Sequence, residues 1–529
     1  MPEFELKIIL SEVYPKFYSK FYPKFIRVGV RFIKGLEFMM SSVKKEKTGR
    51  IAMPEQPAKV RRHNFDEVAL GYTAAEAAAE ASRCIQCRVP RCVEGCPVNV
   101  DIPKFIKLIA GGDPKNAAEK LFETNMLPAV CGRVCPQETQ CEELCVLGKK
   151  GEPVAIGRLE RYAADVKRSG SGQPCPKTGT KNGSTVLETE SCAGRACPPT
   201  GKTVAVIGSG PAGLTAAADL AKRGHSVTIF ESLHLPGGVL TYGIPSFRLP
   251  KSIVKAEIDD ILALGAELKT DYVIGRIKTL DEIAGAYDAV FLGTGAGLPL
   301  FMGIEGENLN GVYSANEFLT RVNLMKAYEP DSNTLIRKGK RIVVVGGGNV
   351  AMDAARSALR LGAEIVTVVY RRSDVELPAR REEIEHAKHE GIEFRFLANP
   401  TKIIGDYGDG TPQGRKFDVK AVECIQMELG APDESGRRSP APVPGSEFVI
   451  DADVVIIAIG TSPNPLIFTG ASGIERTKRG TVAVNENLQT TRENVFAGGD
   501  AVTGAATVIS AMGAGKNAAK AIDDYLMKK

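Results

Sequence analysis

The sequence predicts a multidomain α+β protein in which a helical, cysteine-rich domain precedes two α/β domains. Two observations predict this order. Eight cysteines fall between residues 84 and 145, among helix-forming stretches. From Thr203 onward, an apolar β-branched run followed by glycines and an alanine-rich stretch occurs twice, which is the pattern of a strand, a tight turn and a helix.

The composition is that of a large globular protein. With 529 residues, 43% of them hydrophobic and 25% charged, the chain is long enough for roughly three or four domains. A net charge of +5 over this length gives no reason to expect nucleic acid as a partner. No run of about 18 uncharged apolar residues occurs, so no transmembrane helix is expected, and the start lacks the features of a signal peptide. A cytoplasmic location with reduced thiols is therefore favoured.

The first 52 residues differ from the rest of the chain. The stretch "YPKFYSKFYPKFIRVGVRFIKGL" interleaves aromatic residues with lysine and arginine, whereas ordinary soluble-helix composition begins at Met53. Residues 1–52 are therefore predicted to be a basic aromatic extension, for which a poorly ordered tail or a misread upstream start is favoured. The alternative is an amphipathic segment that docks peripherally on a membrane surface or on a partner subunit.

Residues 53–166 are predicted to form the helical domain, and its cysteines carry the chemistry. The first run has the spacing C-x2-C-x4-C-x3-C-P and the second has C-x3-C-P-x4-C-x3-C. Short loops that gather thiolates favour iron–sulfur clusters, and in two-cluster ferredoxins the last cysteine of a run reaches the other cluster. Zinc is the main rival, although zinc sites usually pair two C-x2-C knuckles and only one occurs here. Structural disulfides would require an oxidising compartment.

Residues 167–201 are rich in Gly, Ser, Thr and Pro and are predicted to be a linker. The segment contains Cys175, Cys192 and Cys197. The spacing of "CAGRAC" is that of a redox dithiol, but it precedes the first α/β strand instead of following its glycines. An inert linker is favoured, with an extra metal site, an intersubunit bridge or a dithiol as alternatives.

The first α/β unit is "KTVAVIGSGPAGLTAAADLAKRGHSVTIFES". Gly208 is expected to make the tight turn, Gly210 to let a pyrophosphate approach the helix N-terminus, and Gly213 to permit close packing of helix on strand. Glu231, at the end of the second strand, is expected to accept a hydrogen bond from a ribose hydroxyl. The unit therefore predicts a dinucleotide site.

The second α/β unit, "KRIVVVGGGNVAMDAARSALRLGAEIVTVVYRRSD", repeats this pattern with Gly346, Gly348 and Ala351. Arg371 and Arg372 stand where the first unit has Glu231. Two arginines at this place can bind an additional phosphate on the ribose, which predicts NADPH in preference to NADH. Two solvated surface arginines are the alternative.

Three further motifs, "YDAVFLGTGA", "DVVIIAIGTSPN" and "TTRENVFAGGDAVTGAATVISAMGAGKNAAKAI", resemble those of two-dinucleotide flavoprotein reductases. The resemblance implies that residues 202–325 and 462–529 bind FAD and that an inserted domain, residues 326–461, binds NADPH. It also places Asp500 at the ribityl chain and the helix that starts near Thr507 at the flavin pyrimidine. The residues thus predicted to bind the two nucleotides are Gly208, Gly210, Pro211, Ala212, Gly213, Glu231, Gly238, Arg248, Gly295, Gly346, Gly348, Asn349, Val350, Ala351, Arg371, Arg372, Gly460, Gly499, Asp500 and Thr507.

From about Met53 to the end, the chain resembles one group of that superfamily. The match rests on "CIQCRVPRCVEGCPV", "CGRVCPQETQCEELC", "AIGRLERYAAD", "GGVLTYGIPSFRLPK" and "YRRSDVELPARREEIEHAKHEG". The group comprises the glutamate synthase small subunit, the large subunit of NADH-dependent ferredoxin:NADP oxidoreductase, archaeal sulfide dehydrogenase and the N-terminal half of dihydropyrimidine dehydrogenase. This resemblance implies two Rossmann-like domains, the second inserted in the first, behind a helical domain with two [4Fe-4S] clusters.

The resemblance also implies the cluster ligands. One [4Fe-4S] cluster would be held by Cys84, Cys87, Cys92 and Cys145, and the other by Cys96, Cys135, Cys141 and Glu160. Cys131 would be a non-ligand. An ordinary exposed helix glutamate is the alternative for Glu160.

The function that the resemblance implies is that of an NADPH-linked oxidoreductase subunit. It would move electrons between NADP(H), FAD and two [4Fe-4S] clusters, to or from a partner subunit or ferredoxin, with flavin bifurcation as one option. The alternatives are the reductase subunit of glutamate synthase and a docking subunit that conducts electrons in a larger complex. The expected partner is an FMN-type synthase chain, a small flavin and [2Fe-2S] chain, or ferredoxin.

No protein general acid is assigned from the sequence. Arg248 and Lys251, in "SFRLPK", are expected either near the flavin or as supports of their loop.

Overall fold

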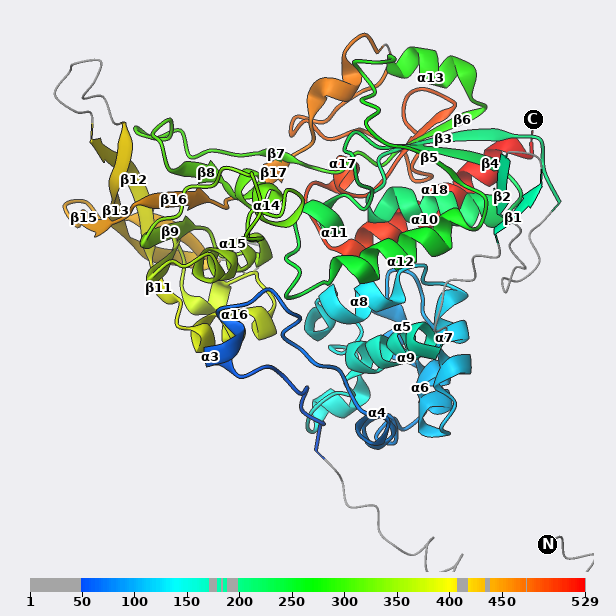
Figure 1. The fold of residues 1–529 in the computed structure, drawn as a ribbon, viewed down its shortest axis with the longest axis horizontal. Coiled ribbons are helices and arrows are strands. Elements are labelled where there is room, and N and C mark those ends of the chain that lie inside the picture. Colours follow the sequence, from blue (N-terminus) through cyan, green and yellow to red (C-terminus); the bar gives the residue numbers. More distant parts are fainter. Residues whose placement is uncertain are drawn as a thin grey trace, which may run out of the picture. The chain divides into compact units, whose positions relative to one another are not determined.

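The computed structural model describes residues 49–170, 178–181, 184–187, 198–406, 417–432, 438–471 and 473–528 (Figure 1). The predicted extension lies outside these residues apart from its last few positions, and so do Cys175, Cys192 and Cys197 of the predicted linker. Two linker strands, β1 (Thr178–Lys181) and β2 (Ser184–Leu187), pair antiparallel. Among the helices described, none has the length and apolar character needed to cross a membrane.

The N-terminal part of the described chain is helical. Local signals begin these helices: a capping box between Thr73 and Glu76 starts α4, and prolines in the first turn start α6, α7 and α8. The elements are α3 (Ala58–Arg61), α4 (Ala74–Ala81), α5 (Arg91–Glu94), α6 (Ile102–Ala110), α7 (Pro114–Phe122), α8 (Pro128–Val134), the 3-10 turns η1 (Gln137–Thr139) and η2 (Val146–Lys149), and α9 (Ile156–Gly170).

The first α/β domain is built on a parallel sheet with the strand order β18-β6-β3-β4-β5. Its strands are β3 (Thr203–Ile207), β4 (Ser226–Phe230), β5 (Glu267–Lys269), β6 (Ala289–Leu292) and β18 (Val495–Ala497). Its helices are α10 (Pro211–Lys222), α11 (Val239–Tyr242), α12 (Lys251–Leu262), α13 (Leu280–Ala286), α17 (Asp500–Thr503) and α18 (Val508–Leu526). Because β18 comes from the C-terminal end of the chain, this domain is split in sequence, as predicted.

The inserted domain has a second parallel sheet, ordered β11-β10-β9-β16-β8, and an antiparallel sheet beside it. The parallel strands are β8 (Val312–Ser314), β9 (Arg341–Val345), β10 (Ile365–Tyr370), β11 (Glu393–Phe396) and β16 (Val454–Ile457). The antiparallel strands are β12 (Ala398–Asp406), β13 (Asp418–Pro432), β14 (Arg438–Pro442) and β15 (Phe448–Asp451). The helices are α14 (Ala315–Asn323), α15 (Asn349–Arg360) and α16 (Arg381–Glu390), with the 3-10 turn η3 (Asp374–Glu376).

The chain passes between the two α/β domains twice, through a short pair of antiparallel strands. β7 (Leu298–Pro299) pairs antiparallel with β17 (Thr461–Ser462), which precedes the 3-10 turn η4 (Pro465–Phe468). The strand β8 belongs to the second sheet although it lies before residue 326, where the sequence placed the start of the second domain. The sheet therefore begins upstream of the expected boundary.

The helical domain shares one continuous hydrophobic core with the first α/β domain. The helices α10 and α18 pack side by side, and α18 also contacts α8 (Figure 1). At that contact the Sγ atom of Cys131 lies 3.5 Å from Sδ of Met512. A Cβ atom added to Gly513 would come within 2.8 Å of the carbonyl oxygen of Pro97, so α18 crosses the cysteine loop as closely as backbone permits.

A buried carboxylate joins the helical domain to α12. Glu257 is completely buried and accepts hydrogen bonds from the backbone N–H groups of Ala129 (2.7 Å) and Val130 (3.1 Å) at the start of α8. Burial raises the pKa of Glu257 to about 7, against the smaller opposing effects of Arg168 and of these two N–H groups.

The raised pKa of Glu257 predicts a pH-dependent stability. Between pH 4.5 and 7 the folded protein holds a proton that the unfolded chain has released, so stability falls as the pH rises through this range. A shift of this size corresponds to about 3 kcal/mol. We expect Glu257→Gln to lose this part of the decline, measured as the free energy of unfolding between pH 4.5 and 8. The exposed Asp259→Asn, on the same helix, is the control; a wild-type decline retained in Glu257→Gln would contradict the assignment.

Candidate functional site

The cysteines of the helical domain fall into two groups, and all those described have free thiols. In the first group, Cys84, Cys87 and Cys92 from the first run lie beside Cys145 from the second, close enough for their charges to interact. The four line one pocket together with apolar side chains such as Ile106 and Val154. Each of the four residues is partly exposed.

The second group lies deeper. Cys96, Cys135, Cys141 and Glu160 interact electrostatically, so the last cysteine of the first run joins two cysteines of the second run. Glu160 is 8% exposed and lies on α9, where its Oε1 atom accepts a hydrogen bond from Nδ2 of Asn125 at 2.8 Å. The structure thus contradicts the alternative of an exposed helix glutamate, because Glu160 is buried beside the cysteines.

The pKa values of these groups indicate what they can bind. Burial, followed by the neighbouring thiols, raises the pKa of Cys92 to about 12, and burial raises the pKa of Cys96 to about 11 and that of Glu160 to about 8. Such groups are protonated at neutral pH unless a cation compensates their charge. A metal cluster that takes thiolate and carboxylate ligands supplies this compensation.

Cys131, the predicted non-ligand, is buried next to the second group. Its Sγ atom lies 3.7 Å from Oδ1 of Asn125 and faces Met512, and burial raises the pKa of its thiol. Its exclusion from the ligands remains a prediction.

The first glycine turn has the geometry of a nucleotide site. Gly208 has φ +100°, and a Cβ atom on Gly213 would lie only 1.9 Å from the carbonyl oxygen of Gly208, so both positions require glycine. By contrast, no protein atom lies within 4 Å of a Cβ added to Gly210, the N-cap of α10. The open space at this helix N-terminus is where a pyrophosphate can bind. Glu231 accepts hydrogen bonds from the N–H groups of Ser209 (3.0 Å) and Leu233 (2.9 Å).

The C-terminal motif closes on the same turn. Gly238 has φ +53° and approaches Gly210, and Gly499 has φ +67° and approaches Ala212. Burial raises the pKa of Asp500 to about 6, and its Oδ1 atom accepts a hydrogen bond from the N–H group of Ala506. Of the other predicted residues here, Pro211 is the first residue of α10 and Gly295 has φ +67° in open space.

The start of α18 connects this turn to the deeper cysteine group. Thr507 is the N-cap of α18, and its side chain accepts the N–H group of Ser510. Gln140, next to Cys141, donates from Nε2 to Oγ1 of Thr507 at 3.5 Å. The helix predicted to face the flavin therefore touches the loop of the second cysteine group.

The second glycine turn repeats the geometry of the first. Gly346 has φ +140°, and a Cβ atom there would lie 2.3 Å from the carbonyl oxygen of Ala458. Gly348, the N-cap of α15, again has no protein atom near an added Cβ. Asn349 begins the helix, Val350 is 40% exposed and Ala351 is buried.

The end of β10 presents the two arginines predicted to recognise a phosphate. Arg371 is exposed, whereas Arg372 is partly buried and donates from Nε to the carbonyl oxygen of Arg438 at 2.8 Å. Gly460, at the crossing between the domains, has φ +119°.

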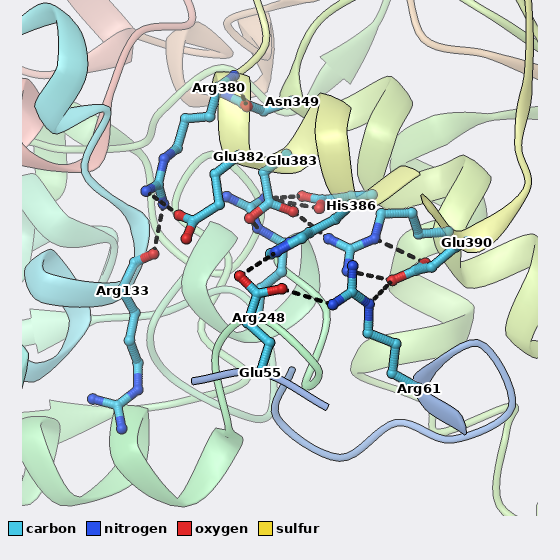
Figure 2. A network of polar contacts seen from close by, with 12 residues as sticks. Glu55, Arg61, Arg133, Arg248, Asn349, Arg380, Glu382, Glu383, His386 and Glu390 are labelled. Atoms are coloured by element: carbon cyan, nitrogen blue, oxygen red, sulfur yellow. Dashed lines mark hydrogen bonds and ion pairs between the residues drawn. The ribbon is translucent and has the colours of Figure 1, made fainter. Parts of the chain in front are cut away.

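Arg248 and Lys251, expected near the flavin or as supports of their loop, are both held by contacts within the protein. Its guanidinium donates to both carboxylate oxygens of Asp353 at 2.7 Å, and Nε lies 2.9 Å from Oε1 of Glu383, so carboxylates of the inserted domain take up its charge (Figure 2). Lys251 donates to the carbonyl oxygens of Leu240 and Ile244 and thus supports its loop. These contacts favour the alternative in which both residues support their loop, and a place near the flavin stays a prediction.

Arg248 belongs to a buried ionic network that the sequence analysis missed. Glu390, which is 1% exposed, accepts hydrogen bonds from Arg61, Arg356 and Arg360. Arg61 lies on α3, which packs against α16. A signal was present in "NVAMDAARSALR", where Asp353, Arg356 and Arg360 share one face of an otherwise apolar helix.

Two stretches of the chain match known families. Residues 61–171 match the family described as dihydropyrimidine dehydrogenase domain II, 4Fe-4S cluster, and residues 202–515 match the pyridine nucleotide-disulphide oxidoreductase family. The chain is 37% identical to the glutamate synthase [NADPH] small chain of Escherichia coli over 484 residues, which cover 90% of this chain and 97% of that protein. The chain belongs to the glutamate synthase small-chain family.

Other relatives of this glutamate synthase small-chain member are larger or more distant. The NADP(+)-dependent formate dehydrogenase subunit beta of Moorella thermoacetica is 41% identical over 82% of this chain, and the match spans only 60% of that subunit. The structure of Mycobacterium tuberculosis FprA in complex with NADPH matches 62% of this chain and 85% of its own, with a TM-score of 0.52 and 20% identity, and shows the shared fold.

Membership of this family confirms the predicted fold class and reaction class. The protein is an NAD(P)H-dependent flavin oxidoreductase with a 4Fe-4S domain. The residues present fit these groups, because each glycine turn leaves an open helix N-terminus for a pyrophosphate and each cysteine group gathers four ligand side chains.

Proposed function

We propose that the protein is the NADPH-linked electron-transfer subunit of a larger enzyme, with FAD at the first glycine turn, NADPH at the second and two [4Fe-4S] clusters in the helical domain. The observation that carries the proposal is the contact of Gln140 with Thr507, which joins the deeper cysteine group to the helix that closes the first glycine turn. When bound, FAD accepts a hydride from NADPH and exchanges single electrons with the clusters.

The chain's own residues supply the binding and the order of the groups. The inner cluster would be held by the deeper group, Cys96, Cys135, Cys141 and Glu160. It is the cluster nearer the first glycine turn, because α18 packs on the loops of this group through Gly513 and Thr507. The outer cluster would be held by the first group, Cys84, Cys87, Cys92 and Cys145. It is the cluster nearer the surface, because these four residues are partly exposed. Electrons would thus enter or leave the protein at the outer group.

The nucleotide preference is inferred from the end of β10. Arg371 and Arg372 place two permanent positive charges where the first domain has Glu231. A guanidinium binds a phosphate dianion through paired N–H groups, whereas a carboxylate suits a ribose hydroxyl. This contrast supports NADPH as the nucleotide.

A partner chain would complete the reaction. The relatives are named as subunits, among them a glutamate synthase small chain and a formate dehydrogenase beta subunit. Beside the outer cysteine group, Ile85 and Val89 are 58% and 69% exposed, and the segment between Cys84 and Cys92 carries two arginines and no acidic residue. An exposed apolar and basic rim of this kind suits transient docking of an acidic electron-transfer chain.

The match over nearly the full length of the E. coli small chain favours one second candidate, the reductase arm of a glutamate synthase. In that case the partner is an FMN-type synthase chain. In the first case it is a small flavin and [2Fe-2S] chain or ferredoxin. Identification of the chain that copurifies under anaerobic conditions separates these candidates.

The proposed cofactors are tested by anaerobic purification with iron and flavin analysis. We expect about eight irons and one FAD in the wild type and about four irons in Cys145→Ala. NADPH should reduce the flavin of both proteins more readily than NADH does. Cys145→Ala should lose at least about tenfold in the reduction of an external acceptor, because its outer cluster is absent.

The matched control for this experiment is Cys131→Ala, which removes a buried thiol from outside the proposed ligand set. It should retain the full iron content. Loss of half the iron from Cys131→Ala, or none from Cys145→Ala, would overturn the ligand assignment. A purified chain without FAD would overturn the proposed function itself.

A further inference from the structure

Arg380 lies between the second glycine turn and the helical domain. It is the N-cap of α16 and its side chain is buried, with 7% exposed. Its backbone N–H donates to Oδ1 of Asn349 at 2.9 Å, and Asn349 is the first residue of α15 after Gly348 (Figure 2). The backbone of Arg380 is therefore attached to the proposed pyrophosphate site.

The side chain of Arg380 reaches in the opposite direction, into the helical domain. Nη1 donates to the carbonyl oxygen of Arg133 at 2.8 Å, and Nη2 donates to Oε1 of Gln137 at 3.1 Å. Arg133 lies in the last turn of α8, where carbonyl groups lack helical partners and a cation is favourable. The guanidinium thus caps the helix that ends immediately before Cys135.

Gln137 extends the contact to the second ligand-bearing helix. Its Nε2 atom donates to the carbonyl oxygen of Cys131 at 3.2 Å, and a Cβ atom on Gly157 would lie 2.2 Å from that Nε2 atom. Gly157 is on α9, one turn before Glu160. The side chain of Gln137 is therefore held between α8, α9 and Arg380, with little freedom to move independently.

The hydrogen bond to Asn349 also orients the amide of that residue. Because Oδ1 accepts a hydrogen bond from the N–H of Arg380, the Nδ2 donors of Asn349 are left for other partners, and Asn349 begins α15 beside the open position at Gly348. An anion bound there would contact the start of α15 and could shift Asn349, to which the backbone of Arg380 is attached. Such a shift would reach the end of α8 through the hydrogen bond from Arg380 to the carbonyl oxygen of Arg133.

We propose that Arg380 is a positioning residue that couples nucleotide binding at the start of α15 to the geometry, and hence the reduction potential, of the inner cysteine group. The inference rests on the proposed function, which places NADPH at Gly348 and a cluster at Cys135. The coupling is reciprocal: if the nucleotide changes the cluster potential, reduction of the cluster changes nucleotide affinity by the same factor.

The test uses a nucleotide that cannot accept electrons. 2′-Phospho-ADP-ribose carries the pyrophosphate and the 2′-phosphate but has no nicotinamide. In the anaerobic holoenzyme, we expect it to bind about tenfold more weakly or more tightly after the inner cluster is reduced, within the usual range of coupling. A tenfold change corresponds to a shift of about 59 mV in an EPR-monitored titration of that one-electron centre.

Arg380→Met removes the side-chain contacts to Arg133 and Gln137, together with the ion pair to Glu382 on the same helix (2.6 Å). It keeps the backbone N–H that donates to Asn349. The affinity of the oxidised protein should therefore change by less than about threefold, while the nucleotide-induced potential shift disappears. Arg381→Gln, at the exposed neighbouring position, is the matched control and should retain the full shift. If Arg380→Met does not fold, Arg380→Lys keeps the charge without the planar fork, and less than half of the shift is expected.

Each result distinguishes this inference from the proposed function. A potential shift that persists in Arg380→Met, or no shift in the wild type, overturns the coupling. An equal loss of affinity in both redox states makes Arg380 a binding residue and also overturns it. Failure of the oxidised wild type to bind the probe, or the absence of a cluster signal, overturns the proposed function instead.

Discussion

Glu390→Gln is expected to destabilise the inserted domain by about 3–5 kcal/mol. Glu390 is the carboxylate on which Arg61, Arg356 and Arg360 converge, and the side chains of Arg356 and Arg360 are completely buried. A glutamine offers one neutral acceptor in place of an anion with two oxygens. The buried Arg360 would then lose its carboxylate partner, while Arg356 and Arg61 would keep only Glu383 and Glu55, in a medium that penalises uncompensated charge.

The effect of Glu390→Gln should extend beyond the inserted domain. Arg61 lies on α3, in the segment that leads to the helical domain. Four residues later, Phe65 stacks on Tyr328 with ring centroids 4.2 Å apart. Loss of the ion pair between Arg61 and Glu390 should therefore also weaken the attachment of this segment. Two quantities are measured for Glu390→Gln and the wild type: the free energy of unfolding in urea and the affinity for NADPH. Glu385→Gln, at an exposed position of the same helix, should change stability by less than about 0.5 kcal/mol. Equal stability of the two variants would show that the network contributes nothing net.

Gly132→Ala is expected to abolish cluster binding by the inner cysteine group, which comprises Cys96, Cys135, Cys141 and Glu160. A Cβ atom at this position would lie 2.5 Å from the backbone nitrogen of Arg161 and 2.7 Å from its Cα atom. Backbone atoms of a helix cannot yield as a flexible side chain does, so α8 must move away from α9. These two helices carry Cys135 and Glu160, and overpacking of this kind typically costs 1–3 kcal/mol or more.

The expected readout of Gly132→Ala is the loss of about four irons per chain together with a lower midpoint of thermal unfolding. The control is Gly285→Ala on α13, where no atom lies within 4 Å of an added Cβ. That substitution should be neutral or slightly stabilising, because alanine favours a helix over glycine. A Gly132→Ala protein with full iron content would show that the two helices can separate without losing their ligands.

The sequence was sufficient where short-range rules are strict. At Gly208 and Gly346, in the two turns, and at Gly213, in α10, an added Cβ would collide with backbone, so the glycines between strand and helix patterns located both turns. The split of the first domain came from family resemblance, through the closing motif that contains Gly499 and Asp500. The approach of Cys145 to Cys84 and Cys92 came from family resemblance, since spacing leaves open which run supplies each cysteine.

The sequence was insufficient where partners are distant. Arg61 and Glu390 are 329 residues apart, and the sequence around neither residue predicts that the two form an ion pair. The pairing of Arg248 was hidden for the same reason, because its partner Asp353 belongs to a different domain. The early start of the second sheet at β8 was also hidden, since Val312–Ser314 is too short for a periodic signal.

The packing of α18 against the cysteine loops has a consequence for biosynthesis. The helical domain leaves the ribosome well before α18, which carries Met512 and Gly513, the residues that cover Cys131 and Pro97. At about 5–20 residues per second, roughly 20 to 70 seconds separate the end of α9 from the start of α18. During that interval the loops that carry the inner cysteine group are open on this side. We therefore expect iron and sulfide to reach these loops more easily on a nascent chain than after α18 has docked.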